Sequence, residues 1–230
     1  MIKTIIFQPG MVTDTVKCYT RAVLANFAVF MKEAQYAVIV LGAGRATRMG
    51  HAKQLLKYQG KTLLARAIEL ALKISDQVLV VLGAYLEETK PEAKKYPVSL
   101  VINHQYREGI GSSIHAGVLV AGEIAPDIDG VLVTLIDQPE ITVEHLSQLA
   151  LGGSAASSIV ATSYGGVVGV PAYFPRRFLD ELGKLSGDTG AKDLLTRYKS
   201  EVIAIPCDAA ANDIDTEKDW RDFIHPDRSS

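Results

Sequence analysis

The sequence predicts an α/β fold of three layers, in which helices cover both faces of a mainly parallel sheet. Two observations support this prediction. From residue 36 to residue 149, short apolar runs alternate with segments whose apolar residues recur at helical spacing. Three of the four apolar runs end at a glycine or an aspartate, where a buried strand would stop. Such alternation indicates βαβ units with right-handed crossovers.

The elements follow in order along the chain. Four apolar runs have the composition of strands buried on both faces, and they cover residues 36–41, 78–82, 98–102 and 130–136. Three segments are predicted to be helices, and they cover residues 62–74, 112–123 and 142–149. Thr142 has the residue type and position of an N-cap for the last of these helices.

The pattern changes after residue 157. Residues 158–162 and 167–174 are predicted to form an antiparallel hairpin, because Tyr164, Gly165 and Gly166 between them suit a tight turn. The remaining elements are predicted helices at residues 176–182, 191–198 and 217–223 and a late strand at residues 201–205. No internal repeat or Pro/Ser-rich linker is present, so a single domain from residue 36 to residue 225 is the simplest organisation.

Residues 1–35 differ from the rest and are treated as an N-terminal extension of unknown role. Pro9-Gly10 marks a turn, and residues 21–32 have the composition of an apolar helix. Met31 is an alternative start, which would make the preceding residues an upstream extension. The other interpretation is a packing element at a subunit contact, and the sequence leaves both open.

Composition excludes several classes of function. The net charge of −2 does not indicate a strongly basic surface for nucleic acid, and the longest apolar run, at residues 23–31, is too short to span a bilayer. We therefore expect a cytoplasmic protein without a nucleic-acid or membrane partner. Cys18 and Cys207 have no metal-ligand spacing, which favours two reduced thiols over one disulfide.

The segment with the clearest chemistry is the loop Leu41-Gly-Ala-Gly-Arg-Ala-Thr-Arg-Met-Gly50, followed by Lys53. It follows the first strand, at the carboxyl edge of the sheet where open α/β sheets bind ligands. Gly42 and Gly44 allow the backbone N–H groups to approach a phosphate. The loop region also supplies three cations suited to phosphate: Arg45, Arg48 and Lys53.

Two common phosphate-binding motifs are excluded. The loop is not a dinucleotide fingerprint, because Thr47 stands where the third glycine belongs and residues 83–85 after the second strand contain no acid for a ribose. It is not a P-loop either, because no G-K-[ST] follows. The remaining alternative is a solvated turn. This interpretation is weaker, because the loop follows a buried strand and carries three cations.

The loop resembles the L-A-[AG]-G-x-S-x-R-M-G-x-x-K signature of nucleotidyltransferases of the MobA/MocA type, which activate the molybdenum cofactor. The resemblance covers residues 36–220 and implies the Rossmann-like nucleotidyltransferase form of the α/β/α fold. It also implies that the loop wraps the triphosphate of an NTP and that Arg48 and Lys53 neutralise it. Gly42 replaces the usual alanine and Ala52 a frequent proline, and neither change removes a charge.

Two acidic segments are candidate metal ligands. Asp137 follows the fourth strand, where a carboxylate can hold a metal or simply cap a turn before Pro139. The family's metal motif is D-x-P, so the resemblance implies that Asp137 binds Mg²⁺. Residues 212–216 on their own suit a helix cap, but they resemble the D-[IV]-D-T-P-E-D tail. That likeness implies that Asp215 completes the metal site, with Asp213 in reserve, and Lys218 departs from the pattern.

Residues 103–117 resemble the N-P-x-[WY]-x-x-G-x-x-[ST]-S-[IL]-x-x-G stretch, which in the family contacts base and ribose. His104 replaces the proline and His115 a frequent arginine, and we interpret His115 as a surface residue rather than a base. Ser112 is an alternative helix cap. The nucleotide-binding residues implied are Leu41, Gly42, Ala43, Gly44, Arg45, Arg48, Lys53, Asn103, Gly109 and Ser113.

Two further stretches resemble the family's G-x-P and G-D-x-G-A-[RK] segments, which we place near the acceptor. The acceptor-binding residues implied are Gly169, Pro171, Asp188 and Gly190. Asp188 has an alternative role as a cap for the helix that follows Gly190.

The resemblance implies nucleotidyl transfer, with Arg48, Lys53 and Asp137 as the catalytic residues. Ala43 and Gln138 match the branch of the family that uses CTP, so the predicted reaction transfers CMP from CTP to the molybdopterin cofactor, for a molybdoenzyme that receives the product. The alternatives are a GTP-dependent enzyme, a transferase for a sugar phosphate, and a non-catalytic carrier of the cofactor. Paired carboxylates favour metal-assisted transfer over simple carrying.

Overall fold

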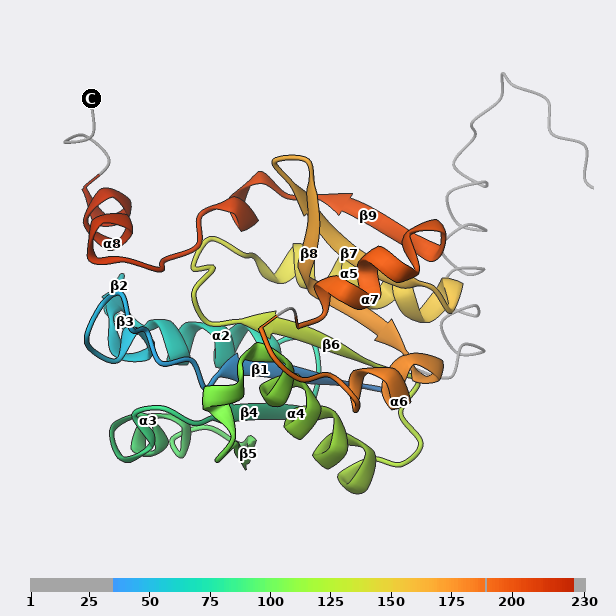
Figure 1. Ribbon diagram of the computed structural model, residues 1–230, viewed down its shortest axis with the longest axis horizontal. Helices are drawn as coiled ribbons and strands as arrows, with labels where there is room; N and C mark the ends of the chain where they lie inside the picture. The colour runs from blue at the N-terminus through green and yellow to red at the C-terminus, as the bar shows by residue number, and fades with distance from the viewer. Residues whose placement is uncertain (1–34, 189, 226–230) are drawn as a thin grey trace, which may run out of the picture. The chain divides into compact units, whose positions relative to one another are not determined.

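The computed structural model describes residues 35–188 and 190–225, and its core is a seven-stranded sheet (Figure 1). The strand order is β5-β4-β1-β6-β8-β7-β9. The strands are β1 (Tyr36–Gly42), β4 (Val78–Leu82), β5 (Ser99–Ile102), β6 (Gly130–Leu135), β7 (Ile159–Tyr164), β8 (Val167–Pro175) and β9 (Val202–Pro206). Only β8 runs against the other strands of this sheet, so the predicted mainly parallel arrangement is confirmed.

The central strands are buried on both faces. Every residue of β4 is buried, and β1 is buried after its first residue. β1 pairs with β4 on one side and with β6 on the other, and helices cover both faces of this part of the sheet. This burial explains why the sequence shows unbroken apolar runs here rather than alternation.

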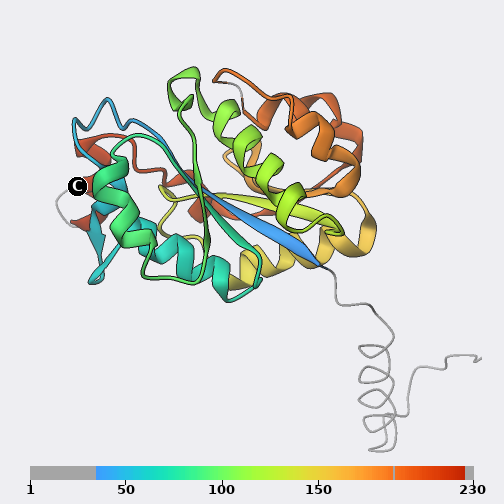
Figure 2. The same ribbon diagram turned by 90° about the horizontal axis from the view of Figure 1, so that it is seen from below.

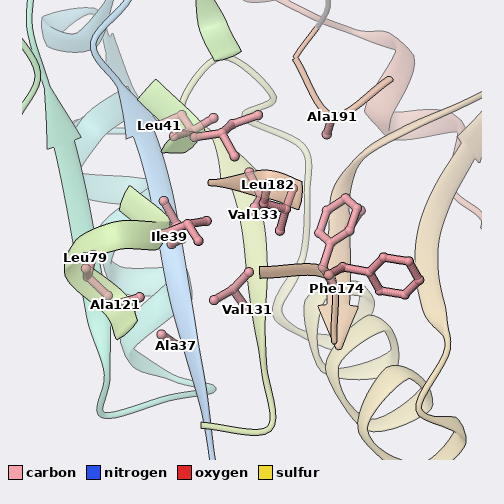
Figure 3. Packing of buried hydrophobic residues seen from close by; sticks show 14 of the residues in the cluster. Ala37, Ile39, Leu41, Leu79, Ala121, Val131, Val133, Phe174, Leu182 and Ala191 are labelled. Carbon is pink, nitrogen blue, oxygen red and sulfur yellow. The ribbon is translucent and has the colours of Figure 1, made fainter. Parts of the chain in front are cut away.

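Helices form the two outer layers (Figure 2). They are α2 (Leu63–Leu72), α3 (Leu86–Ala93), α4 (Ile110–Ile124), α5 (Val143–Ala156), α6 (Leu179–Leu182) and α7 (Lys192–Arg197). The last helix, α8 (Glu217–Ile224), lies beyond the end of the sheet (Figure 1). One apolar cluster joins α4, α6 and α7 to one face of the sheet, and Figure 3 shows part of it around Ile39, Val133 and Phe174. A second cluster joins α2, α3 and α5 to the other face. The predicted three-layer architecture is confirmed.

Local sequence signals account for several boundaries. Thr62 and Thr142 cap α2 and α5, and their hydroxyls accept hydrogen bonds of 3.0 and 3.2 Å from backbone N–H groups three residues later. The predicted hairpin is confirmed as β7 and β8, with Gly165 and Gly166 at φ of +53° and +78° in the turn.

Other details differ from the sequence-based expectation. α3 and the short hairpin of β2 (Lys57–Tyr58) and β3 (Lys61–Thr62) were not predicted. α4 begins after Gly109, so Ser112 is not its cap; the Ser112 hydroxyl donates toward the carbonyl oxygens of Gly109 and Gln105 instead. The predicted helix at residues 176–182 is a 3-10 turn followed by α6.

Some predictions fall on other parts of the chain. The expected helix at residues 21–32, and Cys18, lie outside the described residues. Cys207 forms no disulfide within the described ranges. No helix among residues 35–188 and 190–225 has both the length and the apolar character needed to cross a membrane.

Candidate active site

A cavity of about 380 Å³ lies at the carboxyl ends of β1 and β6. Its walls come from the basic loop after β1, from the segment that enters α4 and from the residues that follow β6. Seven of the ten predicted nucleotide-binding residues line it: Leu41, Ala43, Gly44, Arg45, Lys53, Gly109 and Ser113. Gly42, Arg48 and Asn103 do not line it. Gly42 and Asn103 are hydrogen-bonded to Gln54 and Ser113, which do line it, and Arg48 follows Thr47, which also does.

Gln54, a residue with no role assigned from the sequence, fixes the shape of the basic loop (residues 41–50). Its side chain is fully buried, and its amide nitrogen donates to the carbonyl oxygens of Gly42 and Gly44 at 2.9 and 3.0 Å. Ala46 has a φ of +45° and accepts a hydrogen bond from the Met49 N–H at 2.9 Å, so the loop turns tightly there. The carbonyl oxygens of both glycines are thus hydrogen-bonded to Gln54, which fixes the shape of the loop beside the cavity.

Met49, although part of the family signature, has a packing role. It is buried in a small apolar cluster with Leu63 and Ile214. Trp220 and Phe223 of α8 pack against this cluster. The basic loop and the C-terminal tail are therefore joined by apolar contacts beside the charged centre.

The charged centre brings together three residues that are far apart in sequence. The Lys53 ammonium lies 2.5 Å from Asp137 Oδ2 and 3.1 Å from Asp215 Oδ1, and it donates to the Ile214 carbonyl oxygen at 3.2 Å. The Arg48 guanidinium holds the other Asp215 oxygen at 3.1 Å. The two predicted metal ligands and the two predicted phosphate-binding cations therefore form one cluster.

Burial and charge act in opposite directions on Lys53, which is only 8% exposed. Burial by itself lowers the pKa of Lys53, but the Asp137 and Asp215 carboxylates outweigh it and leave that pKa above its ordinary value. Lys53 is therefore a charged ammonium. Asp213 is exposed overall, but partial burial of its carboxyl group, followed by the nearby Asp137 charge, raises the pKa of Asp213 to about 6.

Asp137 has one oxygen without a partner. Its Oδ2 accepts from Lys53, whereas its Oδ1 is buried and has no hydrogen-bond partner among the described residues. A buried carboxylate oxygen left in this way favours a cation. Within residues 35–188 and 190–225 no group of three or more His, Cys, Asp or Glu side chains is arranged to hold a metal, so a cation here would need further ligands from substrate or water.

A second wall of the cavity is formed at the N-terminus of α4. Asn103 is buried behind it and donates to the Ser112 and Ser113 hydroxyls at 2.9 and 3.1 Å, so Asn103 positions Ser113 without lining the cavity. Gly109 has a φ of +107° and packs against Gly187, where a side chain would have no room. Tyr106 and Arg107 also line the cavity and were not assigned from the sequence.

The four predicted acceptor residues fall into two places. Asp188 lines the same cavity as Gly109 and Ser113, and Gly190 packs near Ile110 of α4. Gly169 and Pro171 lie on β8 and do not line the cavity.

Three other residues singled out from the sequence lie away from the cavity wall. Gln138 is buried, and its amide nitrogen is directed to the carbonyl oxygens of Val170 and Ala210 at 3.4 and 3.1 Å. His115 Nδ1 contacts the carbonyl oxygen of Gly183, which agrees with its interpretation as a non-catalytic residue. His104 is exposed and does not line the cavity.

Comparison with known proteins identifies the family. Residues 38–202 match the MobA-like NTP transferase domain. The chain is 30% identical over 196 residues to the purine catabolism protein PucB of Bacillus subtilis, covering 79% of this chain and 92% of that protein. It is 31% identical to the nicotine blue oxidoreductase of Paenarthrobacter nicotinovorans, covering 77% and 91% of the two chains.

Solved structures agree with this assignment. Rv0371c from Mycobacterium tuberculosis superposes with a TM-score of 0.69 at 27% identity, over 84% of this chain and 98% of the other. The nucleotidyl transferase Mth528 shares the fold at 21% identity with a TM-score of 0.68, covering 85% and 99% of the two chains. With its cation-lined cavity and paired carboxylates at the carboxyl edge of the sheet, this chain belongs to the family of MobA-like NTP transferases.

Proposed function

We propose that this protein transfers CMP from CTP to the molybdopterin form of the molybdenum cofactor and releases pyrophosphate. The observation that carries the proposal is the convergence of Lys53, Asp137 and Asp215 at the edge of a cavity lined by a glycine-rich basic loop. Cations and backbone N–H groups suit a triphosphate, and paired carboxylates suit a divalent metal.

In the proposed reaction, a phosphate oxygen of the acceptor attacks the α-phosphorus of CTP. The bond from the α-phosphorus to the bridging oxygen breaks, and that oxygen leaves with pyrophosphate. The attacking phosphate monoester is already anionic, so the reaction needs no side-chain base. Arg45 and Lys53 line the cavity and would bind the triphosphate, while Arg48 at its rim would neutralise charge on the leaving group.

Asp137 and Asp215 fit a divalent cation, because both offer hard oxygen ligands and Asp137 Oδ1 is buried without a partner. When bound, such an ion would act as a Lewis acid on the phosphate oxygens. The related Rv0371c has been solved in complex with manganese, at 27% identity and a TM-score of 0.65 to this chain. We propose Mg²⁺ as the ion used by this protein.

The preference for CTP rests on Ala43. This residue matches the branch of the family that uses CTP; it is buried, lies beside Gly83 and contributes to the cavity wall. Gln138, the other residue that matches the CTP branch, is directed to Val170 and Ala210 and has no direct contact with the cavity. The choice of molybdopterin rests on the likeness of the residue 166–171 and 187–192 segments to the family.

The experiment is a pyrophosphate-release assay with each of the four NTPs, Mg²⁺ and molybdopterin. Release that requires both CTP and molybdopterin is the expected result. Release of pyrophosphate from GTP would show that GTP is the nucleotide, and release that requires a sugar phosphate would show that a sugar phosphate is the acceptor. CTP binding without release from any pair would favour a carrier. Because one relative is named an oxidoreductase, a parallel assay for oxidation of NADH or NADPH is included, and turnover there would overturn the proposal.

A further inference from the structure

The ammonium of Lys53 has no donor left for a ligand. It carries three N–H donors, and three oxygens surround it: Asp137 Oδ2 at 2.5 Å, Asp215 Oδ1 at 3.1 Å and the Ile214 carbonyl at 3.2 Å. The side chain is also almost completely buried. Lys53 is therefore fully engaged by the two carboxylates that the proposed function assigns to the metal.

The ammonium also lies beside any ion that both carboxylates would hold. Asp137 Oδ1 is buried without a partner, and it belongs to the carboxylate whose Oδ2 lies 2.5 Å from Lys53 Nζ. Asp215 Oδ1 lies 3.1 Å from the same Nζ, so an ion ligated by the two carboxylates would be close to the ammonium. Two cations at such short range repel each other strongly in a partly buried site.

Lys53 has a second set of partners available. It lines the cavity together with Gly44 and Arg45, so its side chain lies at the boundary between the carboxylates and the space proposed for the triphosphate. A triphosphate presents several anionic oxygens to an ammonium. Asp215 is 42% exposed and Asp137 only 16%, so after Lys53 leaves, Asp215 is the carboxylate with more freedom to adjust around an ion.

We propose that Lys53 blocks the metal position in the nucleotide-free protein, and that the triphosphate opens this position by drawing the ammonium into the cavity. Lys53 then has two roles, as an internal competitor of the metal and as a ligand of the phosphates. The inference rests on the proposed function in that it takes the cavity to bind an NTP. Metal and nucleotide bind cooperatively as a consequence, because each favours the same position of Lys53.

The test measures Mn²⁺ binding to the full chain without nucleotide, by the EPR signal of free Mn²⁺. The wild type is expected to bind weakly, whereas Lys53→Met is expected to bind about 10- to 100-fold more tightly, the usual range of coupling between sites. Lys57→Met, which removes an exposed cation outside the centre, should behave like the wild type. The double variant Lys53→Met, Asp137→Asn should lose the increase in Mn²⁺ affinity.

The thermal midpoint gives a second readout. Removal of Lys53 leaves Asp137 without its partner, so Mn²⁺ should raise the midpoint of Lys53→Met, or restore its folding, and should leave the wild type nearly unchanged. Tight Mn²⁺ binding to the free wild type would overturn the inference, and that measurement needs no variant. Equal or weaker binding by Lys53→Met would overturn it as well.

These measurements involve neither acceptor nor turnover, so they separate the two proposals. Pyrophosphate release together with tight Mn²⁺ binding to the free wild type would reject the role of Lys53 and leave the reaction standing. Weak binding to the wild type and strong binding to Lys53→Met, without pyrophosphate release from any substrate pair, would reject the reaction and support the competition.

Discussion

The backbone N–H of Ile214 donates a hydrogen bond of 2.9 Å to the carbonyl oxygen of Asp137. This bond joins the C-terminal tail to the end of β6 through main-chain atoms alone. The carboxylates of Asp137 and Asp215 are therefore brought together by a contact that substitution of either side chain leaves in place. Loss of activity on such a substitution will report on the chemistry of the carboxylates.

Asp137→Ala and Lys53→Ala are each expected to reduce turnover by about 10²–10³, the usual cost of one electrostatic group at a phosphoryl or acyl centre. Asp137→Ala should keep its fold, because the backbone bond from Ile214 remains, whereas Lys53→Ala leaves Asp137 without its partner and should also lower the free energy of unfolding. Steady-state rates and circular dichroism measure the two effects. Asp193→Asn is a suitable control, since Asp193 is exposed on α7. Normal turnover by Asp137→Ala with Mg²⁺ would show that the metal assignment is wrong.

Gln54→Leu is expected to raise the KM for the nucleotide more than it lowers kcat. The change removes the donor to two carbonyl oxygens, so the loop loses its brace and stability falls by about 1–3 kcal/mol. Initial rates and chemical denaturation check both parts. Gln77→Leu alters an exposed glutamine and should change neither. A variant with lowered stability and an unchanged KM would indicate that the loop shape does not depend on Gln54.

Asp188→Asn is expected to change nucleotide binding and to leave the KM for the acceptor nearly unaltered. The reason is its position in the cavity wall beside Gly109 and Ser113, apart from Gly169 and Pro171. Calorimetric titration with CTP and the KM for each substrate distinguish an effect on nucleotide binding from an effect on acceptor binding. An effect confined to the acceptor would support the acceptor assignment made from the sequence.

Ala43→Gly is expected to shift the nucleotide preference from CTP toward GTP. Ala43 is the cavity-lining residue that matches the CTP branch of the family, and the substitution would remove its buried methyl group beside Gly83. The ratio of kcat/KM for the two nucleotides is the measurement. An unchanged ratio would remove the structural basis for choosing CTP.

Stability is expected to fall at acid pH because of His145. Its Nε2 lies 2.9 Å from the Thr162 hydroxyl, and that hydroxyl donates to the Pro171 carbonyl at 2.6 Å, so Nε2 must carry the donated proton. Burial lowers the pKa of His145. As the pH falls through about 6.5, His145 takes up a proton in the unfolded chain before it does so in the folded chain. The free energy of unfolding is therefore at its full value above this pH and decreases below it.

His145→Gln keeps a donor for Thr162 without the titration. Denaturation curves at pH 7.5 and pH 5.5 should show a smaller loss of stability for this variant than for the wild type. Equal losses would mean that other groups account for the acid sensitivity.

The sequence predicted the strands that are buried on both faces and the helices that begin with a capping threonine. Strands β1, β4 and β6 lie between two helical layers, so their apolar runs are unbroken and easy to recognise. Thr62 and Thr142 mark helix starts by local chemistry. α3 was missed because it is polar and contains Pro91, a residue that usually ends a helix.

The site was predictable where the family motifs define it. Lys53, Asp137 and Asp215 could be named from their motifs, and the structure brings them together. Gln54 gave no signal, because its role exists only once the chain folds back beneath Gly42 and Gly44. The acceptor role of Asp188 stays a prediction; the structure places it in the cavity wall, where the Gly187 carbonyl accepts from the Gly111 N–H at 2.9 Å, a contact that no local sequence signal indicates.

The reversed direction of β8 has an evolutionary consequence. It divides the sheet into a first part, β5-β4-β1-β6, encoded before Ser157, and a second part, β8-β7-β9, encoded after it. A recombination event near Ser157 would exchange the second part as one continuous stretch of gene while leaving every right-handed crossover of the first part intact. Such an exchange would keep the loop after β1, Lys53 and Asp137, and it would replace Asp215, which the second part contributes to the charged centre.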